Sequence, residues 1–323
     1  MERILSCTIL PEWEGLTVDA VLRRRFRLSS RQIGTAKFRE NGIMIDGVRS
    51  RTSRIVRAGE TLRIAIPGDE EKHTLLPLEG TPDIRFECED FVVVNKPGGM
   101  ATHPSHGHYA DTLANLLTGY YAGKGEAFVF RPVGRLDLET SGLLCIAKNA
   151  AAAEWFARDR ERKVLKRQYL ALCHGHFEEK RGIIDQPIRN VPGTLMVREV
   201  HGEGLPARTE FEVLAEYRFR RDGQPKAEKS VSLVQLTLDT GRTHQIRVHM
   251  AWLGHTLLGD RIYGSQDLPD FGMKRAALHA WRLSGIKPFT TEEFEIRCEL
   301  PEDMRGICGG RALPPFQEPG SVQ

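Results

Sequence analysis

The chain has 323 residues, of which 40% are hydrophobic and 28% are charged, and its formal net charge is +3. This length predicts two domains, and no apolar run approaches the roughly 18 residues that a membrane span needs. The six cysteines form no Cys-x-x-Cys pair and the N-terminus lacks a long apolar core, which argues against a zinc site, a disulfide scaffold and a secreted protein and predicts a cytoplasmic one.

Positive charge is concentrated at the start of the chain. Residues 1–67 hold 13 Lys and Arg against 7 Asp and Glu, whereas the remainder holds 33 against 36. A small basic unit ahead of a near-neutral larger one predicts a domain that binds a polyanion, joined to a separate working domain. We call residues 1–67 the front module.

Two helices are expected in the front module. The segment "TVDAVLRRRF" (17–26) has apolar residues at helical spacing and Thr17 as its N-cap. The segment "SSRQIGTAKFRENG" (29–42) begins with a serine cap and is expected to end at Asn41-Gly42.

Short strands are expected after these helices, at "IMID" (43–46) and "ETLRIAIP" (60–67). This order resembles the small RNA-binding fold first recognised in a ribosomal protein of the small subunit. A solvated charged face is the alternative interpretation of the basic residues. The candidate RNA-binding residues of the front module are Arg23, Arg27, Arg31 and Lys37.

A polar linker is expected at 68–80 and a larger domain at 81–310, followed by a disordered tail at 311–323. Strands and helices mix in the larger domain without strict alternation. The expected helices are 111–122 and 149–164, and the expected strands are 91–95, 143–148, 166–175, 208–219, 231–240 and 292–300. The predicted fold class is α+β: a large catalytic domain with a mixed, mainly antiparallel sheet and flanking helices, preceded by a small α/β RNA-binding domain.

The segment "RPVGRLDLETSGLLCIAKN" (131–149) contains the first candidate for chemistry. Asp137 precedes the turn Thr140-Ser141-Gly142, and an apolar strand follows. The carboxylate is therefore expected in a loop at a strand edge, where reactive groups are common. An aspartate that merely caps the turn, with Arg135 as a structural partner, is the alternative.

Two later segments carry further candidates. In "KRQYLALCHG" (166–175), Tyr169 opens an apolar strand. In "DTGRTHQIRVHMAWLGH" (239–255), a Gly-Arg-Thr turn containing Arg242 enters a helix, on which His244 and Arg247 share a face. An arginine that reaches a buried carboxylate would hold it ionised, as a nucleophile or base requires.

These three segments, in this order, resemble the three motifs of the RluA-type pseudouridine synthases, and the resemblance covers about residues 80–300. It implies that Asp137 is the essential carboxylate, that Tyr169 stacks on the target base and that Arg247 pairs with Asp137. It also implies that Arg135 helps to displace the target uridine, with Arg242 and His244 beside it. The chain departs from the pattern in one place, because many members have His where it has Gly134.

The resemblance implies an isomerase that flips a uridine of structured RNA and rebuilds it as pseudouridine. The expected RNA is ribosomal RNA of the large subunit in preference to tRNA. The reaction involves neither redox chemistry nor hydrolysis, so no cofactor or metal is expected. The chain is expected to act as a monomer, with no membrane attachment and no obligatory protein partner.

Two other functions remain open from the sequence. A metal hydrolase could use clustered histidines, and the candidates are His103, His106, His108, His174 and His176. A non-catalytic RNA-binding or ribosome-assembly factor would need only the basic front module. The joint presence of Asp137, Tyr169 and Arg247 argues against that second alternative.

Overall fold

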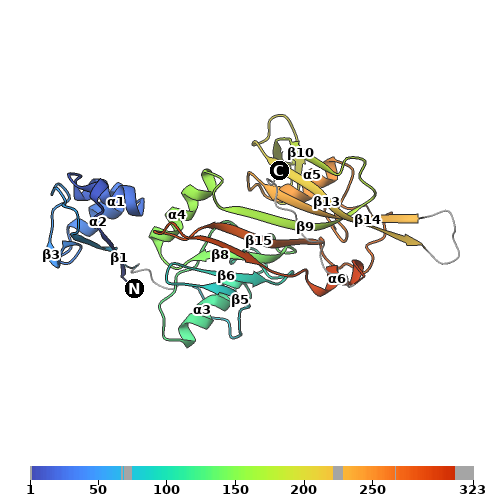
Figure 1. Ribbon diagram of the computed structural model, residues 1–323. Coiled ribbons are helices and arrows are strands. Elements are labelled where there is room, and N and C mark those ends of the chain that lie inside the picture. The colour runs from blue at the N-terminus through green and yellow to red at the C-terminus, as the bar shows by residue number, and fades with distance from the viewer. Residues whose placement is uncertain (1, 67, 69–74, 221–227, 266, 310–323) are drawn as a thin grey trace.

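The computed structural model describes residues 2–66, 68, 75–220, 228–265 and 267–309. The predicted tail at 311–323 and the middle of the predicted linker lie outside these ranges. The chain forms the front module and a large unit of residues 75–309 (Figure 1). No helix of the described ranges is long and apolar enough to cross a membrane.

The front module is a four-stranded antiparallel sheet with two helices. Thr17 and Ser29 cap the helices as predicted, and each accepts a hydrogen bond from a main-chain N–H of the first turn. The sheet order is β1-β4-β2-β3. The elements are β1 (Arg3–Thr8), η1 (Pro11–Trp13), α1 (Val18–Phe26), α2 (Ser30–Lys37), β2 (Ile43–Ile45), β3 (Val48–Arg49) and β4 (Thr61–Ile66).

Two details of the front module differ from the prediction. The second helix ends at Lys37 instead of Asn41-Gly42, because the chain folds back there. A Cβ at Gly42 would lie 1.8 Å from the carbonyl oxygen of Ala36, so only glycine permits this approach. Strand β1 had no predicted counterpart, since Leu5 is the only fully buried residue in it.

The large unit contains a mixed sheet of ten strands in the order β10-β13-β14-β9-β15-β8-β6-β5, with β16 beside β15 and β7 beside β8. Only the β15–β8 pair is parallel, so the predicted mainly antiparallel, mixed sheet is confirmed. The elements are β5 (Ile84–Glu87), β6 (Phe91–Lys96), α3 (Leu113–Gly123), β7 (Arg131–Pro132), β8 (Ser141–Ala147), α4 (Ala150–Glu161), β9 (Lys166–His174), β10 (Arg181–Asp185), β11 (Ile188–Asn190), β12 (Arg198–Val200), β13 (Arg208–Arg220), β14 (Glu228–Leu238), α5 (Gln245–Trp252), β15 (Leu278–Ile286), β16 (Glu293–Arg297) and α6 (Glu302–Ile307).

Helices α3 and α4 cover opposite faces of the sheet at β6 and β8. Alternate residues of a strand point to opposite faces. Val92 and Val94 of β6 accordingly belong to the apolar cluster that contains α3, whereas Phe91 and Val93 belong to the one that contains α4. This two-sided burial explains why the strand reads as a continuous apolar run.

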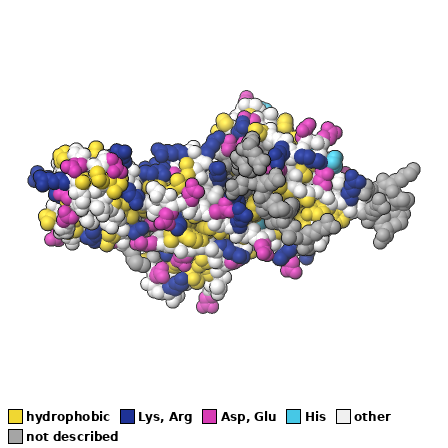
Figure 2. Space-filling model, in the orientation of Figure 1, with side chains coloured by type: hydrophobic (Ala, Val, Ile, Leu, Met, Phe, Trp, Pro, Cys, Tyr) yellow, Lys and Arg dark blue, Asp and Glu magenta, His cyan; other side chains and the backbone are white. Residues whose placement is uncertain are grey.

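The front module is docked onto the large unit. Arg3 of β1 makes two hydrogen bonds to Asp90, with distances of 2.7 and 2.9 Å, and Asp90 is buried. Arg27 lies 2.5 Å from Asp159, which is 1% exposed, and its guanidinium stacks 4.0 Å from the ring of Trp155. One apolar cluster contains buried side chains of both units. Figure 2 shows Lys and Arg side chains over the front module and along the neighbouring edge of the large unit.

These contacts give Arg27 a structural role beside the predicted one. Its guanidinium is engaged by Asp159 and Trp155, so it holds the two units together. Arg27 also has a φ of 53°, the left-handed conformation that favours glycine. This conformation ends α1, because the main-chain N–H of Arg27 donates to the carbonyl of Leu22. Arg31 and Lys37 are exposed, and Arg23 pairs with Asp19 at the surface.

Candidate active site

Asp137 lies in the loop that joins β7 to β8, as the sequence predicts. Strand β15 brings this loop close to β9, because Ala280 pairs with Gly142 of β8 on one side and with Tyr169 of β9 on the other. A Cβ at Gly142 would lie 2.3 Å from the carbonyl oxygen of Ala280, so the strands meet closely only with glycine there.

A pocket of about 560 Å³ opens at this place. It is large enough for a nucleotide base and sugar, within the usual range for small-ligand sites. The loop of Asp137, the start of β9, the end of α4 and the turn that enters α5 all contribute to its wall. The predicted site residues that line it are Arg135, Asp137, Tyr169, Arg242, His244 and Arg247.

The main chain around Asp137 is held on both sides. The Thr102 hydroxyl donates to the carbonyl of Leu136 at 2.9 Å, and the main-chain N–H of Thr140 donates to the carbonyl of Asp137 at 3.1 Å. The carboxylate of Asp137, by contrast, has no hydrogen-bond or ion-pair partner within the described ranges. The backbone is thus fixed while the carboxylate remains available to a ligand in the pocket.

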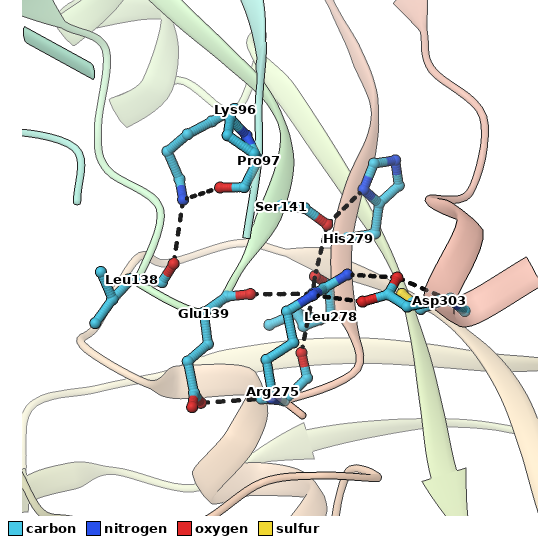
Figure 3. Close-up of polar contacts among 11 residues, drawn as sticks. Lys96, Pro97, Leu138, Glu139, Ser141, Arg275, Leu278, His279 and Asp303 are labelled. Carbon is cyan, nitrogen blue, oxygen red and sulfur yellow. Dashed lines mark hydrogen bonds and ion pairs between the residues drawn. The ribbon is translucent and has the colours of Figure 1, made fainter. Parts of the chain in front are cut away.

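Two cations hold the rest of this loop (Figure 3). Lys96 donates to the carbonyl of Leu138 at 3.3 Å, and Arg275 donates to the carbonyl of Glu139 at 3.0 Å. Both cations come from segments remote in sequence. Lys96 also binds the carbonyls of Pro97 and Met100, at 2.9 and 2.7 Å.

Lys96 has no exposed surface. Burial lowers the pKa of this lysine to about 7, and the negative charge of Asp137 opposes that shift. The two side chains therefore interact electrostatically, although the structure shows no direct hydrogen bond between them.

Tyr169 forms part of the pocket wall and is only 4% exposed. Burial raises the pKa of its phenol, so the hydroxyl stays protonated at neutral pH. A neutral aromatic ring suits a platform for a base, and a phenol that stays protonated is not available as a proton acceptor at neutral pH.

Arg247 is where the structure differs most from the predicted site. Its guanidinium makes a bidentate pair with Asp260, at 2.7 and 2.6 Å, and lies 3.2 Å from Glu139. The predicted pairing with Asp137 is therefore wrong for this structure. Asp260 and Arg247 are both buried, so Arg247 reaches the Asp137 loop indirectly, through Glu139.

The other predicted contacts lie at different depths. Arg135 is exposed at the pocket mouth and donates to the Thr243 hydroxyl, and Arg242 is exposed and donates to the carbonyl of Pro206 at 3.0 Å. His244 is buried and lies 2.9 Å from the Tyr263 hydroxyl. His244 is also the N-cap of α5, in a left-handed conformation, and not a residue of the helix as the pattern predicted.

Within the described ranges, the clustered histidines are not gathered into one site that could hold a metal ion. Of these, His103 lines the pocket, His108 pairs with Asp111 and His176 pairs with Glu216. In the part of the chain that the structure describes, no three His, Cys, Asp or Glu side chains are placed to hold a metal ion.

Sequence reasoning gave no role to several residues that build the site. Lys96 stands in the apolar segment "VVVNKPGG", and a lysine beside an apolar strand could have been noticed as a buried cation. Arg167 precedes Tyr169 by two residues, and strand alternation places both on one face. Nothing in the sequence pointed to Asp260 as the partner of Arg247.

Comparison with known proteins gives a consistent result. The family model described as RNA pseudouridylate synthase matches residues 90–252. The chain is 38% identical over 254 residues to YhcT of Bacillus subtilis, an uncharacterised RNA pseudouridine synthase, and this covers 79% of the chain and 80% of YhcT. It is 32% identical over 314 residues to ribosomal large subunit pseudouridine synthase D of Nitrosomonas europaea, covering 95% and 87% of the two chains.

A solved structure agrees with these relatives. The human RNA pseudouridylate synthase domain containing 1 superposes with a TM-score of 0.55 at 33% identity. The match covers 68% of this chain and 83% of the human one.

Proposed function

The chain belongs to the RNA pseudouridylate synthase family, and we propose that Asp137 is the residue on which its isomerase reaction depends. In this reaction the bond from the ribose to N1 of uracil breaks, the ring turns, and a bond from the ribose to C5 forms. The C5 hydrogen is lost to solvent. Covalent and acid–base routes through a carboxylate both require it to be ionised and unobstructed.

One observation carries the assignment. The carbonyls of residues 136–139 are all bound within the protein, whereas the Asp137 carboxylate faces the pocket without a partner in the described ranges. A reactive group on a fixed backbone loses little freedom when the substrate binds, which is how preorganised sites lower a barrier.

The neighbouring residues fit a flipped nucleotide. A base that is rebuilt on its sugar must leave the helical stack. The Tyr169 ring offers a surface for it, and base–aromatic stacking is worth about 1–3 kcal/mol. Exposed Arg135, at the mouth, can take the vacated position because a guanidinium both stacks and donates hydrogen bonds.

The test is release of tritium from RNA that carries tritiated uridine at C5, with purified enzyme in the presence of a chelator. Asp137→Asn keeps the shape of the side chain, so it is expected to fold normally, bind RNA through phosphate contacts and release no tritium. Glu161→Gln is the matched control, because Glu161 is an exposed carboxylate at the same pocket. Turnover by Asp137→Asn, or equal loss in both variants, would remove Asp137 from this role.

We propose in addition that the RNA is large-subunit ribosomal RNA and that the chain acts in the cytoplasm as a monomer, without cofactor or protein partner. The name of the Nitrosomonas relative and the basic front module support the first point. Mapping pseudouridines in total RNA from cells that lack the gene tests it. A missing pseudouridine in tRNA alone would overturn it.

A further inference from the structure

An arginine with no partner among the described residues stands in the pocket wall beside the proposed platform. Arg167 lies two residues before Tyr169 on β9, and both side chains line the pocket. Arg167 is half-buried, and within the described ranges no carboxylate or carbonyl binds its guanidinium. An unpaired cation that is partly withdrawn from water is costly unless a ligand supplies the opposite charge.

The guanidinium of Arg167 lies in a slot between two glycines. A Cβ at Gly134 would be 2.9 Å from one terminal nitrogen of Arg167, and a Cβ at Gly241 would be 3.2 Å from the other. Gly134 also has a φ of 92°, which favours glycine. A side chain at position 134 would therefore require the end of the Arg167 side chain to move. Gly134 and Arg167 therefore form one feature.

Apart from Asp137, whose carboxylate lines the same pocket, the surrounding charges leave the slot positive. Arg160, at the end of α4, lines the same wall and has no acidic partner in the described ranges. Asp239 also lines the wall, but it is occupied by Lys163 at 2.5 Å and Arg208 at 3.3 Å. Glu161 is exposed to water, so it screens the slot only weakly.

We propose that Arg167, in the slot between Gly134 and Gly241, binds a phosphate group that adjoins the flipped uridine. This inference rests on the proposed function, because a flipped nucleotide brings its own phosphates to the pocket mouth. The planar guanidinium presents two parallel N–H groups, a geometry that matches phosphate oxygens. Tyr169 and Arg167, on one strand face, would then hold the base and the phosphate of the same nucleotide.

Binding of small nucleotides tests this without turnover. The dissociation constants of uridine, uridine 3′-monophosphate and uridine 5′-monophosphate are measured by NMR titration of the purified full chain. One monophosphate is expected to bind at least about tenfold more tightly than uridine, and which one identifies the phosphate. Equal affinity of all three for the intact protein would overturn the proposal.

Two variants test whether the preference for a monophosphate depends on Arg167. Arg167→Met should abolish the preference for the monophosphate. Lys166→Met should retain it. This substitution removes the same charge from the residue before Arg167, whose side chain is exposed and lies outside the pocket. Similar losses in both variants would indicate general attraction and contradict a defined slot.

A substitution at Gly241 tests the slot itself. Gly241 does not have a positive φ, so Gly241→Ala crowds Arg167 without straining the backbone and should weaken the preference several-fold. An unchanged preference in Gly241→Ala would refute the slot. Asp137→Asn should keep the preference while it loses tritium release. Tritium release by Asp137→Asn with the phosphate preference intact would refute the proposed function alone, and loss of the phosphate preference in the intact protein would refute this subsite alone.

Discussion

A lysine with no exposed surface lies directly behind the loop of Asp137. Its ammonium group binds three carbonyls, two from its own turn and one from Leu138. Other donors, including the main-chain N–H of Gly99, also hold that loop. Lys96 is therefore expected to contribute more to the free energy of unfolding than to turnover.

The contribution of Lys96 should depend on pH. The folded pKa of about 7 lies below the value of about 10.4 for an unfolded chain. Between these two values the unfolded state binds more protons, so the stability contributed by the wild-type lysine rises with pH. The free energy of unfolding of the wild type minus that of Lys96→Met, measured in urea, should become more positive from pH 6.5 to pH 9. A value that becomes more negative over this range would refute the lowered pKa.

The sequence identified Asp137, Tyr169 and Arg247 as pocket residues because each stands in an ordered motif. It could not assign the partner of Arg247. Asp137 precedes Arg247 in the chain and Asp260 follows it, and both carry a carboxylate. Only the packing of α5 decides which of the two the guanidinium contacts. Arg167 was visible as a basic residue, but its slot depends on two glycines from different loops.

At the scale of elements, the site depends on how closely β8 approaches β15. Local signals predicted where the first two helices begin, because Thr17 and Ser29 are caps whose effect is confined to one turn. The parallel pairing of β8 with β15 joins segments about 138 residues apart, and no local pattern contains that information.

Gly142→Ala tests this close approach. The new Cβ would meet the main chain of Ala280 at 2.3 and 2.5 Å, at a φ of 111°, so the variant should lose at least about 1–3 kcal/mol of stability. Gly34→Ala is the control: Gly34 lies in α2 with open space around it, and alanine should stabilise the helix by about 0.5–1 kcal/mol. Thermal unfolding of both variants decides; a Gly142→Ala variant as stable as wild type would contradict the packing described.

At the scale of the whole molecule, the front module has a fixed position relative to the pocket. Helix α4 connects the two: Trp155 and Asp159 contact Arg27, and Arg160 reaches the pocket wall one residue later. Charge counts along the sequence predicted a basic module but not its docking, because Arg27 looks like its neighbours in α1.

Arg27→Met should loosen the docking of the front module, because Asp159 would remain buried without its cation, although the Arg3–Asp90 contact and the shared apolar cluster would persist. Spin labels on cysteines introduced at the exposed positions Ser53 and Glu302 report the distance between the units. We expect one narrow distance distribution in the wild type and a broad one in Arg27→Met. Arg31→Met, which removes an equal charge from an exposed residue, should keep the narrow one. A narrow distribution in Arg27→Met would show that other contacts suffice.

The docked face also constrains the history of the family. A chain that lost the front module would expose the Trp155 ring and the Phe289 side chain, both buried here, and would leave the carboxylate at 159 without its arginine. Selection would then favour polar residues in place of the two aromatic ones and would no longer retain the aspartate at position 159. Homologues without a front module should therefore lack all three residues, whereas homologues with a docked module should gain or lose Arg27 and Asp159 together.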